Sequence, residues 1–478
     1  MWFKRIKSIS VLFVVVAVLM WTVSVVYAES KDSELEQLKA TINQMQKTIE
    51  QQNERIEDLE KAKAVPAPVA AQPVKEAMPT MKVEGKPAPV APRYTMSDQQ
   101  EASPRLNDLT LDPKYQGFIP VPNTKVMIKF NAKPRVDMTW DNQNAGDDTR
   151  FITAKIPVEG DSNRGGGARF NINSKGSQFR IDVRAPEVDG SPRFYFQNDF
   201  FGSGENDLNL RIQHIYGQIY NIIVGKTYSV FEDPDVWPDT VDYEGPNSMI
   251  FQRRELVRYQ LQVSKEWYLN LGIEKPTPSV DNSGYENVDT VKRWPEVGVN
   301  ARWERSGMGH VQLSSIFRDL RVRSDVVGKQ SVLGWGVNAG AGLDITKTDS
   351  VQALLVYGEG IGSFSNDAFS TGPTDAAFDS SGDLKALEYY SAMVGFTHRW
   401  SDVWRSTVSY GYVHLDNEEG QSDSAYHTTQ YASANLIWQL RKRLSVGLEG
   451  LYGTRETNDG RDGNVFRMQL GLLYSIFD

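Results

Sequence analysis

The stretch VMIKFNAKPRVDMTW at 126–140 alternates apolar and polar residues over an unusual length. Every even position from Val126 to Trp140 is apolar or proline, and every odd position after Met127 is polar. This alternation predicts a β-strand with one apolar and one polar face. Strands of globular proteins usually have about 5–6 residues, so the length of this one needs a separate explanation.

The alternating unit recurs to the end of the chain, and sixteen segments can be delimited. Their approximate ranges are 125–141, 168–185, 192–202, 207–219, 221–231, 249–263, 266–275, 294–304, 308–323, 331–345, 350–362, 388–400, 403–416, 426–439, 443–456 and 464–477. Short connections (264–265, 346–349, 401–402, 441–442) take turns with longer ones (142–167, 232–248, 276–293, 363–387). Strands of about 9–11 residues, joined by short turns at one end and longer loops at the other, are typical of outer-membrane barrels.

A soluble β-sandwich would show the same alternation, so other features must separate the two folds. Five tryptophans lie near the short turns, where an interfacial aromatic belt is expected; they are Trp267, Trp303, Trp400, Trp404 and Trp438. A closed barrel also removes edge strands. The sequence therefore predicts an all-β transmembrane barrel of about 16 antiparallel strands over 125–478. Pro134 cannot donate to a central ladder, and we expect a bulge or a strand start there.

The hydropathy and charge of the whole chain are compatible with this fold. The mean hydropathy of −0.45 excludes a helical membrane protein but not a barrel, because only alternate residues of a barrel strand face lipid. The net charge of −9 argues against nucleic-acid binding.

The N-terminal part has a different character and divides into three segments. Residues 1–28 combine a basic start, an apolar stretch over 11–26 and a small-residue cleavage site at Ala28, which predicts a signal peptide; an uncleaved anchor is the alternative. Residues 29–61 carry a heptad seam and predict a short coiled-coil helix. The seam consists of Leu35, Leu38, Ile42, Met45, Ile49, Ile56 and Leu59, with Gln52 at one core position. Residues 62–124 are a proline-rich linker and barrel lead-in.

Motifs for enzyme chemistry are missing from the sequence. The chain has no cysteine, and its five histidines are scattered without the HExxH spacing of zinc enzymes. It also lacks the GxSxG motif of serine hydrolases. We therefore predict no enzyme activity, no metal and no cofactor; a barrel hydrolase with a site on its outer surface is the alternative.

One long loop concentrates negative charge directly before a strand that starts with arginines. The loop acids are Glu232, Asp233, Asp235, Asp239, Asp242 and Glu244, and the arginines are Arg253, Arg254 and Arg258. If the loop folds into the barrel, these opposed charges would constrict the lumen and focus a field across it. The alternatives are a solvated loop or a divalent-cation site. Because neighbours on a strand point to opposite faces, Arg253 and Arg254 are not both expected to line the lumen.

The polar face of the first strand is basic as well. Lys129, Lys133 and Arg135 share it, and Arg180, Arg184, Arg211, Arg318 and Arg321 add cations in other strands. A cation facing lipid at mid-depth costs about 2–4 kcal/mol, so most of these side chains should point inward. An anion-preferring lumen follows as a hypothesis.

Several segments resemble the DcaP-like trimeric porins of Gram-negative outer membranes. They are GKTYSVFEDPDVWPDTVDYEGP at 225–246, GEGIG at 358–362, YASANLIW at 431–438 and GLYG at 450–453. The order of signal, coiled coil, Pro/Ala linker and sixteen-stranded barrel also matches this family. The resemblance implies a homotrimer in the outer membrane, with the coiled coil in the periplasm, that takes up small anionic solutes such as dicarboxylates.

Two other functions compete with an anion-selective porin for ion and solute transport. The barrel could act as a structural tether, with outer-membrane lipid around it and the cell wall bound by the coiled coil. It could also be a sugar-selective pore, which needs a run of inward aromatic side chains. By parity, aromatic residues such as Phe194, Phe196, Tyr410 and Tyr412 fall on the apolar face, and this pattern favours the anion pore.

Overall fold

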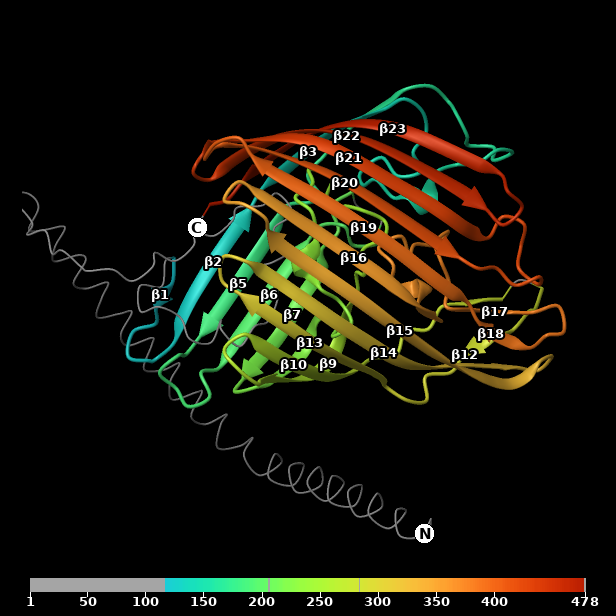
Figure 1. The fold of residues 1–478 in the computed structure, drawn as a ribbon, viewed down its shortest axis with the longest axis horizontal. Coiled ribbons are helices and arrows are strands. Elements are labelled where there is room, and N and C mark those ends of the chain that lie inside the picture. Colours follow the sequence, from blue (N-terminus) through green and yellow to red (C-terminus); the bar gives the residue numbers. More distant parts are fainter. Residues whose placement is uncertain (1–116, 205–206, 283, 477–478) are drawn as a thin grey trace, which may run out of the picture. The chain divides into compact units, whose positions relative to one another are not determined.

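The computed structural model describes residues 117–476, apart from 205–206 and 283. They form one antiparallel sheet of 20 strands and a separate sheet of three (Figure 1). The described residues include no helix long and apolar enough to cross a membrane. The predicted signal peptide (1–28), coiled coil (29–61) and most of the linker lie outside the described residues.

The strands of the large sheet are short near the start of the chain and longer toward its end. They are β1 (Ile119–Pro120), β2 (Met127–Lys133), β3 (Arg135–Asp141), β4 (Arg169–Asn173), β5 (Gln178–Arg184), β6 (Arg193–Asp199), β7 (Arg211–Ile219), β8 (Ile222–Tyr228), β9 (Arg253–Gln262), β10 (Trp267–Glu274), β12 (Asp289–Thr290), β13 (Glu296–Arg305), β14 (Gly309–Ser324), β15 (Gly328–Asp344), β16 (Asp349–Glu359), β19 (Glu388–Arg399), β20 (Trp404–Leu415), β21 (Tyr426–Arg441), β22 (Leu444–Thr457) and β23 (Asp462–Tyr474). The small sheet joins β11 (Val280–Asp281), β17 (Ala376–Phe378) and β18 (Leu384–Ala386), and thus ties two long loops together.

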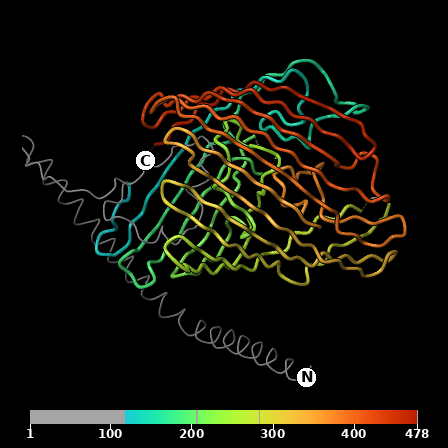
Figure 2. The backbone as a smooth tube through the Cα atoms, in the orientation of Figure 1, coloured from blue at the N-terminus to red at the C-terminus, as the bar shows by residue number. Residues whose placement is uncertain are grey.

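Hydrogen bonds connect the strands of the large sheet in one continuous series; Figure 2 shows the path of the backbone through these strands, coloured by residue number. The series runs β4–β3–β23–β22–β21–β20–β19–β16–β15–β14–β13–β10–β9–β8–β7–β6–β5–β2–β1, and β12 pairs with the end of β14. The last strand, β23, therefore lies beside β3, which belongs to the first long segment.

The first two predicted segments are each divided into two strands. Pro134 separates β2 from β3, because proline has no N–H to donate to a ladder. Residues 174–177 likewise separate β4 from β5. The β3–β4 ladder and the β2–β5 ladder join the same two stretches of chain, 127–141 and 169–184. The second ladder therefore continues the first beyond the interruption. These two interruptions and the two-residue strands β1 and β12 account for the difference between twenty observed strands and about sixteen predicted ones.

The faces of the sheet are reversed relative to a soluble protein. Along β3 the buried positions are Arg135, Asp137, Thr139 and Asp141, while Trp140 on the other face is 43% exposed. Large apolar side chains such as Phe170 and Leu355 are exposed across the outer face. Such a sheet needs an apolar environment outside, as a bilayer provides.

An apolar core nevertheless exists inside the sheet, where long loops pack on its inner wall. Phe231 and Trp237 from one loop and Phe364 from another belong to this core, together with inward residues such as Ile316. The rings of Phe231 and Phe364 meet edge to face at 5.3 Å. This core thus fixes the long loops against the inner face of the sheet. It does not join two layers of sheet, as the core of a β-sandwich does.

The five predicted tryptophans lie beside short turns. Trp267 is paired with Trp303 across β10 and β13, and Trp404 with Trp438 across β20 and β21. The Trp404 and Trp438 rings are stacked at 5.2 Å. Trp400 stands at the turn between β19 and β20. This end of the sheet thereby carries a row of tryptophan rings, all exposed except the half-buried Trp303.

The outward apolar face predicts a depth-dependent cost for charge. Leu271 stands in the middle of β10 beside Tyr259 and Val299, all exposed, so Leu271→Arg should lower the free energy of unfolding in lipid vesicles by about 2–4 kcal/mol. Val263→Arg, on the same face but beside a short turn, should cost about 0–1 kcal/mol. Urea titrations in vesicles measure both, and equal losses would contradict a lipid-facing band.

Candidate functional site

The loop of residues 229–252, between β8 and β9, lies along the inner wall of the sheet; it is called the inward loop below. Almost all of its residues are buried. Glycines on the wall strands make room for it: an added Cβ at Gly340 would come within 2.7 Å of Asp233 Oδ2, and one at Gly395 within 2.9 Å of Pro238. The loop therefore depends on small residues at inward positions of β15 and β19.

Wall side chains hold the backbone of the inward loop. The amides of Asn300, Gln312 and Asn338 donate to the carbonyl oxygens of three loop residues, Val230, Glu232 and Phe231. The Glu274 carboxylate accepts from the Val230 N–H at 2.6 Å. Since buried backbone groups need partners, these amides fix the path of the loop across β10, β13, β14 and β15.

Asp233 and Asp235 of the inward loop pair with bases on β13 and β14. Arg302 contacts Asp233 at 3.2 Å and Asp235 at 2.7 Å, and His310 Nε2 lies 2.9 Å from Asp233 Oδ2. Asp233, Asp235 and His310 each offer one ligand atom, all within 4.8 Å of one another. A divalent cation could use these atoms, but Arg302 already engages both carboxylates, and the arrangement fits charge pairing better.

The next acid, Asp239, pairs with β20. Arg405 Nε lies 2.5 Å from Asp239 Oδ2, and both side chains are buried. Asn435 on β21 donates to the Asp239 carbonyl oxygen at 2.8 Å. The middle of the inward loop is therefore held by β20 and β21, whereas its start is held by β13 and β14.

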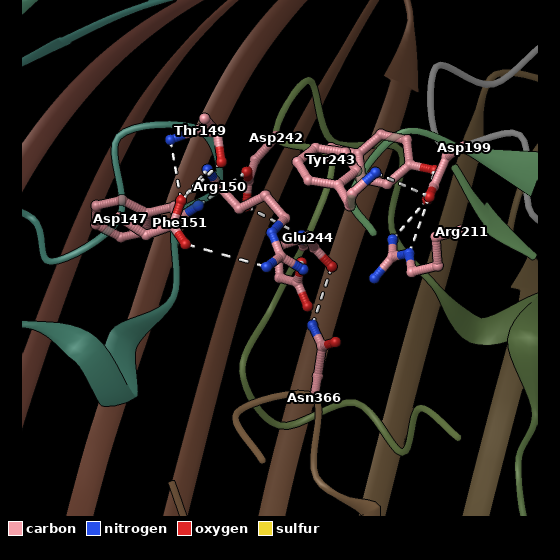
Figure 3. A network of polar contacts seen from close by, with 12 residues as sticks. Asp147, Thr149, Arg150, Phe151, Asp199, Arg211, Asp242, Tyr243, Glu244 and Asn366 are labelled. Carbon is pink, nitrogen blue, oxygen red and sulfur yellow. Dashed lines mark hydrogen bonds and ion pairs between the residues drawn. The ribbon is translucent and has the colours of Figure 1, made fainter. Parts of the chain in front are cut away.

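The end of the inward loop meets two other long loops, and this place is called the loop junction (Arg150, Lys155, Arg211, Glu244 and Asn366). Arg150 pairs with Glu244 at 3.1 Å, and Asn366 donates to the Glu244 carbonyl oxygen at 2.9 Å. Figure 3 shows Arg150 between Asp147 and Glu244, with Asp199 and Arg211 on the far side of Tyr243. Three cations reach the junction with partly accessible side chains: Arg150 is 11% exposed, Lys155 25% and Arg211 30%.

Tyr243 connects the junction to the first strands. Its hydroxyl donates to Asp199 Oδ2 at 2.9 Å and accepts from the amides of Gln178 and Gln213. Arg211 closes this network through its ion pair with Asp199 at 2.5 Å. The end of the inward loop thus bridges from β22 and β23 on one side to β6 and β7 on the other.

Burial changes the protonation of the loop acids in two directions. Burial raises the pKa of Asp242 to about 7, and it also raises the pKa values of Glu232 and Glu244. For Asp233, burial is outweighed by His310 and Arg302, which lower its pKa. Asp233 therefore stays charged, while its neighbour Glu232 and the acids Asp242 and Glu244 nearer the end of the loop bind protons more readily.

The three predicted arginines of β9 differ in their surroundings, and two of them, Arg253 and Arg258, lie close enough to Glu232 of the inward loop to act on its charge. Arg254 is buried in an ion pair with Glu296, and its guanidinium covers the Phe364 ring at 3.9 Å. Arg258 is buried and donates to the carbonyl oxygen of Tyr228. Arg253, at the first position of β9, is half-buried over the Tyr228 and Phe251 rings.

The other predicted cations belong to the first strands. Arg135 is buried and pairs with Asp137 at 2.7 Å. Lys133 is buried as well, and Lys129 is half-buried near the Phe118 ring. Arg211 stands at the loop junction, as described above.

The strands β2, β5, β6 and β7 form a basic wall. Their charged residues all lie on the inward face and comprise six cations and two carboxylates: Lys129, Lys133, Arg180, Arg184, Arg193 and Arg211, with Asp182 and Asp199. Asp182 contacts both Arg184 and Arg193. Cations outnumber carboxylates threefold on these four strands, so they carry a local excess of positive charge.

The sequence reasoning missed Arg302, His310 and Arg405 as partners of the loop acids, and Arg150 and Lys155 at the junction. The alternation placed Arg302 and Arg405 on inward faces, so a signal for their orientation existed. Their partners depend on the path of the inward loop. A pattern of inward glycines in the facing strands could have suggested that path.

Comparison with known proteins identifies the family of this chain and supports its fold. The family model described as DcaP outer membrane protein matches residues 107–476. The crystal structure of the outer membrane channel DcaP of Acinetobacter baumannii has a TM-score of 0.65 at 21% identity, over 75% of this chain and 99% of that chain. No curated protein matches this chain.

Two further porins match more distantly. The anion-selective porin from Comamonas acidovorans is 10% identical with a TM-score of 0.47, over 73% of this chain and 100% of that one. OmpF of Salmonella typhi is 9% identical with a TM-score of 0.45, over 75% and 100%. Of these likenesses, only the one to the Acinetobacter channel supports the fold.

The paired acids predict that Arg302 stabilises the inward loop. Arg302→Gln leaves Asp233 and Asp235 without their guanidinium in a buried site, and the free energy of unfolding should fall by about 3 kcal/mol. Arg305→Gln on the same strand is the matched control: its pair with Glu266 is exposed and should contribute less than about 1 kcal/mol. Urea unfolding and protease cleavage within 229–252 measure the effect; equal results for the two variants would contradict this role.

Asp242 predicts a pH dependence of both stability and selectivity. Because its pKa rises from 3.8 to about 7 on folding, the folded state binds more protons between these values, and the contribution of Asp242 to stability falls as pH rises through that window. Above pH 7 its negative charge appears on the inward loop. The ratio of anion to cation permeability, measured as reversal potential, should therefore decrease from pH 5.5 to 8.

Two variants test this assignment. Asp242→Asn should reduce the pH dependence of the reversal potential, because the substituted amide does not titrate. Asp459→Asn is the control, since hydrogen bonds and Arg461 lower the pKa of this exposed carboxyl and keep it ionised throughout. An unchanged pH profile in Asp242→Asn would show that Asp242 does not titrate beside the ion path.

Proposed function

The chain belongs to the DcaP outer membrane protein family, and from this premise we propose that it is a porin for small anionic solutes of the dicarboxylate class. The solutes would diffuse passively through the interior of the barrel. No cofactor and no bond-making step is needed for this function, since selectivity follows from pore geometry and charge.

The proposal includes a closed barrel of sixteen antiparallel strands. It is supported by the pairing of β23 with β3 and by the continuation of the β3–β4 ladder in β2–β5. Counted in this way, β2 with β3 and β4 with β5 are single strands crossing the membrane. Closure satisfies every backbone N–H and C=O within the bilayer, which is required where no water is available.

The orientation and assembly are part of the same proposal. Residues 1–28 would direct export, and the coiled coil at 29–61 would stand in the periplasm and join three subunits. The linker at 62–124 would connect it to the barrel at 125–478, and the short turns with their tryptophans would face the periplasm. Contact of the coiled coil with the cell wall is compatible with this arrangement.

The single observation that carries the anion preference is the basic wall of β2, β5, β6 and β7. Six cations and two carboxylates face inward there. In a passage with low-dielectric walls such an excess raises the local concentration of anions. A solute with two carboxylates would be attracted more strongly than one with a single charge, since the Coulomb energy scales with solute charge.

The loop junction is proposed as the narrowest part of the path. Arg150, Lys155 and Arg211 reach it with partly exposed side chains, and Phe201 lies 4.8 Å from the Arg150 guanidinium and 5.3 Å from that of Arg211. A guanidinium fixed in this way keeps donors available for a carboxylate. The loop acids would narrow the lumen while their wall partners offset their charge.

The predicted selectivity residues have different places in this proposal. Lys129, Lys133, Arg135 and Arg211 contribute to the positive potential from the first strands. Arg253, Arg254 and Arg258 contribute from β9, where Arg254 also compensates Glu296. The field at the junction is the sum of these charges and those of the paired acids.

Arg211 gives a direct test of anion preference. Arg211→Gln removes a partly exposed cation and leaves Asp199 uncompensated, so the reversal potential in a salt gradient should shift toward cations. Arg211→Lys is the matched control, because it keeps the positive charge while losing the paired guanidinium geometry. The shift should shrink at 1 M salt, where the Debye length is about 3 Å. Unchanged selectivity in a folded Arg211→Gln channel would remove Arg211 from the selectivity path.

A further inference from the structure

The outward faces of β8, β9 and β10 change from apolar to charged at one common level. Val224, Val257 and Ile273 are exposed and lie in one row, since Val224 pairs with Val257 and Val257 with Ile273. The next outward row contains Lys226, Glu255 and Lys275. Lys226 is paired with Glu255 across β8 and β9, and Lys275 forms an ion pair with Glu255 at 3.2 Å. The change from the apolar row to the charged row marks the boundary of the apolar band at the end of the sheet where the long loops lie.

A cavity lies at this boundary, on the outer side of the sheet. It has a volume of about 570 Å³, and its floor is the row of Val224, Val257 and Ile273. Its rim comes from Lys275 and from the loop segment 292–295 that leads into β13. The cavity thus has an apolar floor that continues the lipid-facing band and a rim at the height where polar groups begin.

The rim is strongly basic. Lys275, Lys292 and Arg293 are exposed, and the Arg293 guanidinium lies 5.7 Å from the Trp294 ring. Among the described residues, neither Lys292 nor Arg293 forms an ion pair with a carboxylate. Two acids line the cavity, Glu255 and Glu274; Glu274 is buried, and its carboxylate accepts from the Val230 N–H of the inward loop. An exposed tryptophan beside lysine and arginine is typical of a membrane interface.

We propose that this cavity binds a phosphorylated lipid of the surrounding membrane leaflet. The acyl chains would lie on the row of Val224, Val257 and Ile273, and the phosphate would sit between Lys275, Lys292 and Arg293. Basic pockets beside membrane-spanning segments bind anionic lipid head groups for this reason. The charge of the rim and the apolar floor together fit a ligand that is anionic at one end and aliphatic at the other. This site is on the outer face and is independent of solute transport through the lumen.

The chain offers a matched pair of double variants for the test. Lys292→Ser with Arg293→Ser removes two rim cations, whereas Arg323→Ser with Lys329→Ser removes two exposed cations that are paired across the β14–β15 hairpin. Both variants change the net charge equally and alter only exposed side chains. Heat-modifiable gel mobility checks that each barrel is folded.

Binding is measured by native mass spectrometry of the detergent-solubilised full chain with three probes: dioctanoyl phosphatidic acid, dioctanoylglycerol and inorganic phosphate. The Lys292/Arg293 variant should bind phosphatidic acid five- to tenfold more weakly than the parent, and the Arg323/Lys329 variant should change less than twofold. Dioctanoylglycerol, which lacks the phosphate, should bind both variants like the parent. Val257→Ser should weaken both lipid probes, because it alters the floor. Inorganic phosphate should bind far more weakly than phosphatidic acid.

Several results would overturn the proposal. Unchanged phosphatidic acid binding in the Lys292/Arg293 variant, or an equal loss in the control variant, would show that the rim does not recognise the phosphate. If inorganic phosphate bound with the same affinity as phosphatidic acid, the apolar floor would play no part. Loss of the oligomer in the Lys292/Arg293 variant, with the same amount of lipid bound per subunit, would assign the cavity to a contact between subunits. Unchanged selectivity in the Arg211 experiment, which would count against the proposed anion path, would leave the lipid-binding results unaffected.

Discussion

The constraint on which the structure depends is that its sheet has an apolar outside. Because the outer face carries side chains such as Phe170 and Leu355, the alternation of a strand sends the polar residues inward. The interior therefore receives many charged groups that a soluble protein would keep on its surface. Buried charge is costly unless it is paired or hydrated. The ion pairs, the loop packing and the lumen of this protein all follow from that inversion.

The inward loop compensates part of this buried charge. Asp233 and Asp235 engage Arg302, and Asp239 engages Arg405, so three acids that would be costly alone neutralise bases of the wall. The loop can come this close because Gly340 and Gly395 present no side chain at the contact. Its apolar residues, including Phe231 and Trp237, add a core inside the sheet. Charge pairing and apolar packing thus hold the same loop, and neither requires it to fill the interior completely.

The sequence was sufficient for the strands and insufficient for the contacts within the lumen. Each of the sixteen predicted ranges overlaps strands of the structure, including the interruption at Pro134, because a period of two is a local property. Parity also placed Lys133 and Arg135 on the buried face. It could not show that Asp239 meets Arg405, since these residues are 166 positions apart and their contact depends on the path of a loop. The expected opposition between the loop acids and β9 arginines failed to anticipate Glu296 as the partner of Arg254 for the same reason.

The distribution of paired and unbalanced charge explains why the acidic chain is compatible with an anion path. An acid and a base in contact largely cancel at distances beyond their separation, so the pairs of Arg302 and Arg405 contribute little to the field along the lumen. The basic wall differs, because Asp182 and Asp199 are too few to balance six cations. The net charge of −9 describes the whole chain, including exposed loops that are screened by salt within about 10 Å at 0.1 M. In the proposed porin, the local imbalance on β2, β5, β6 and β7, rather than the overall charge, would therefore determine the sign of the field that a solute meets.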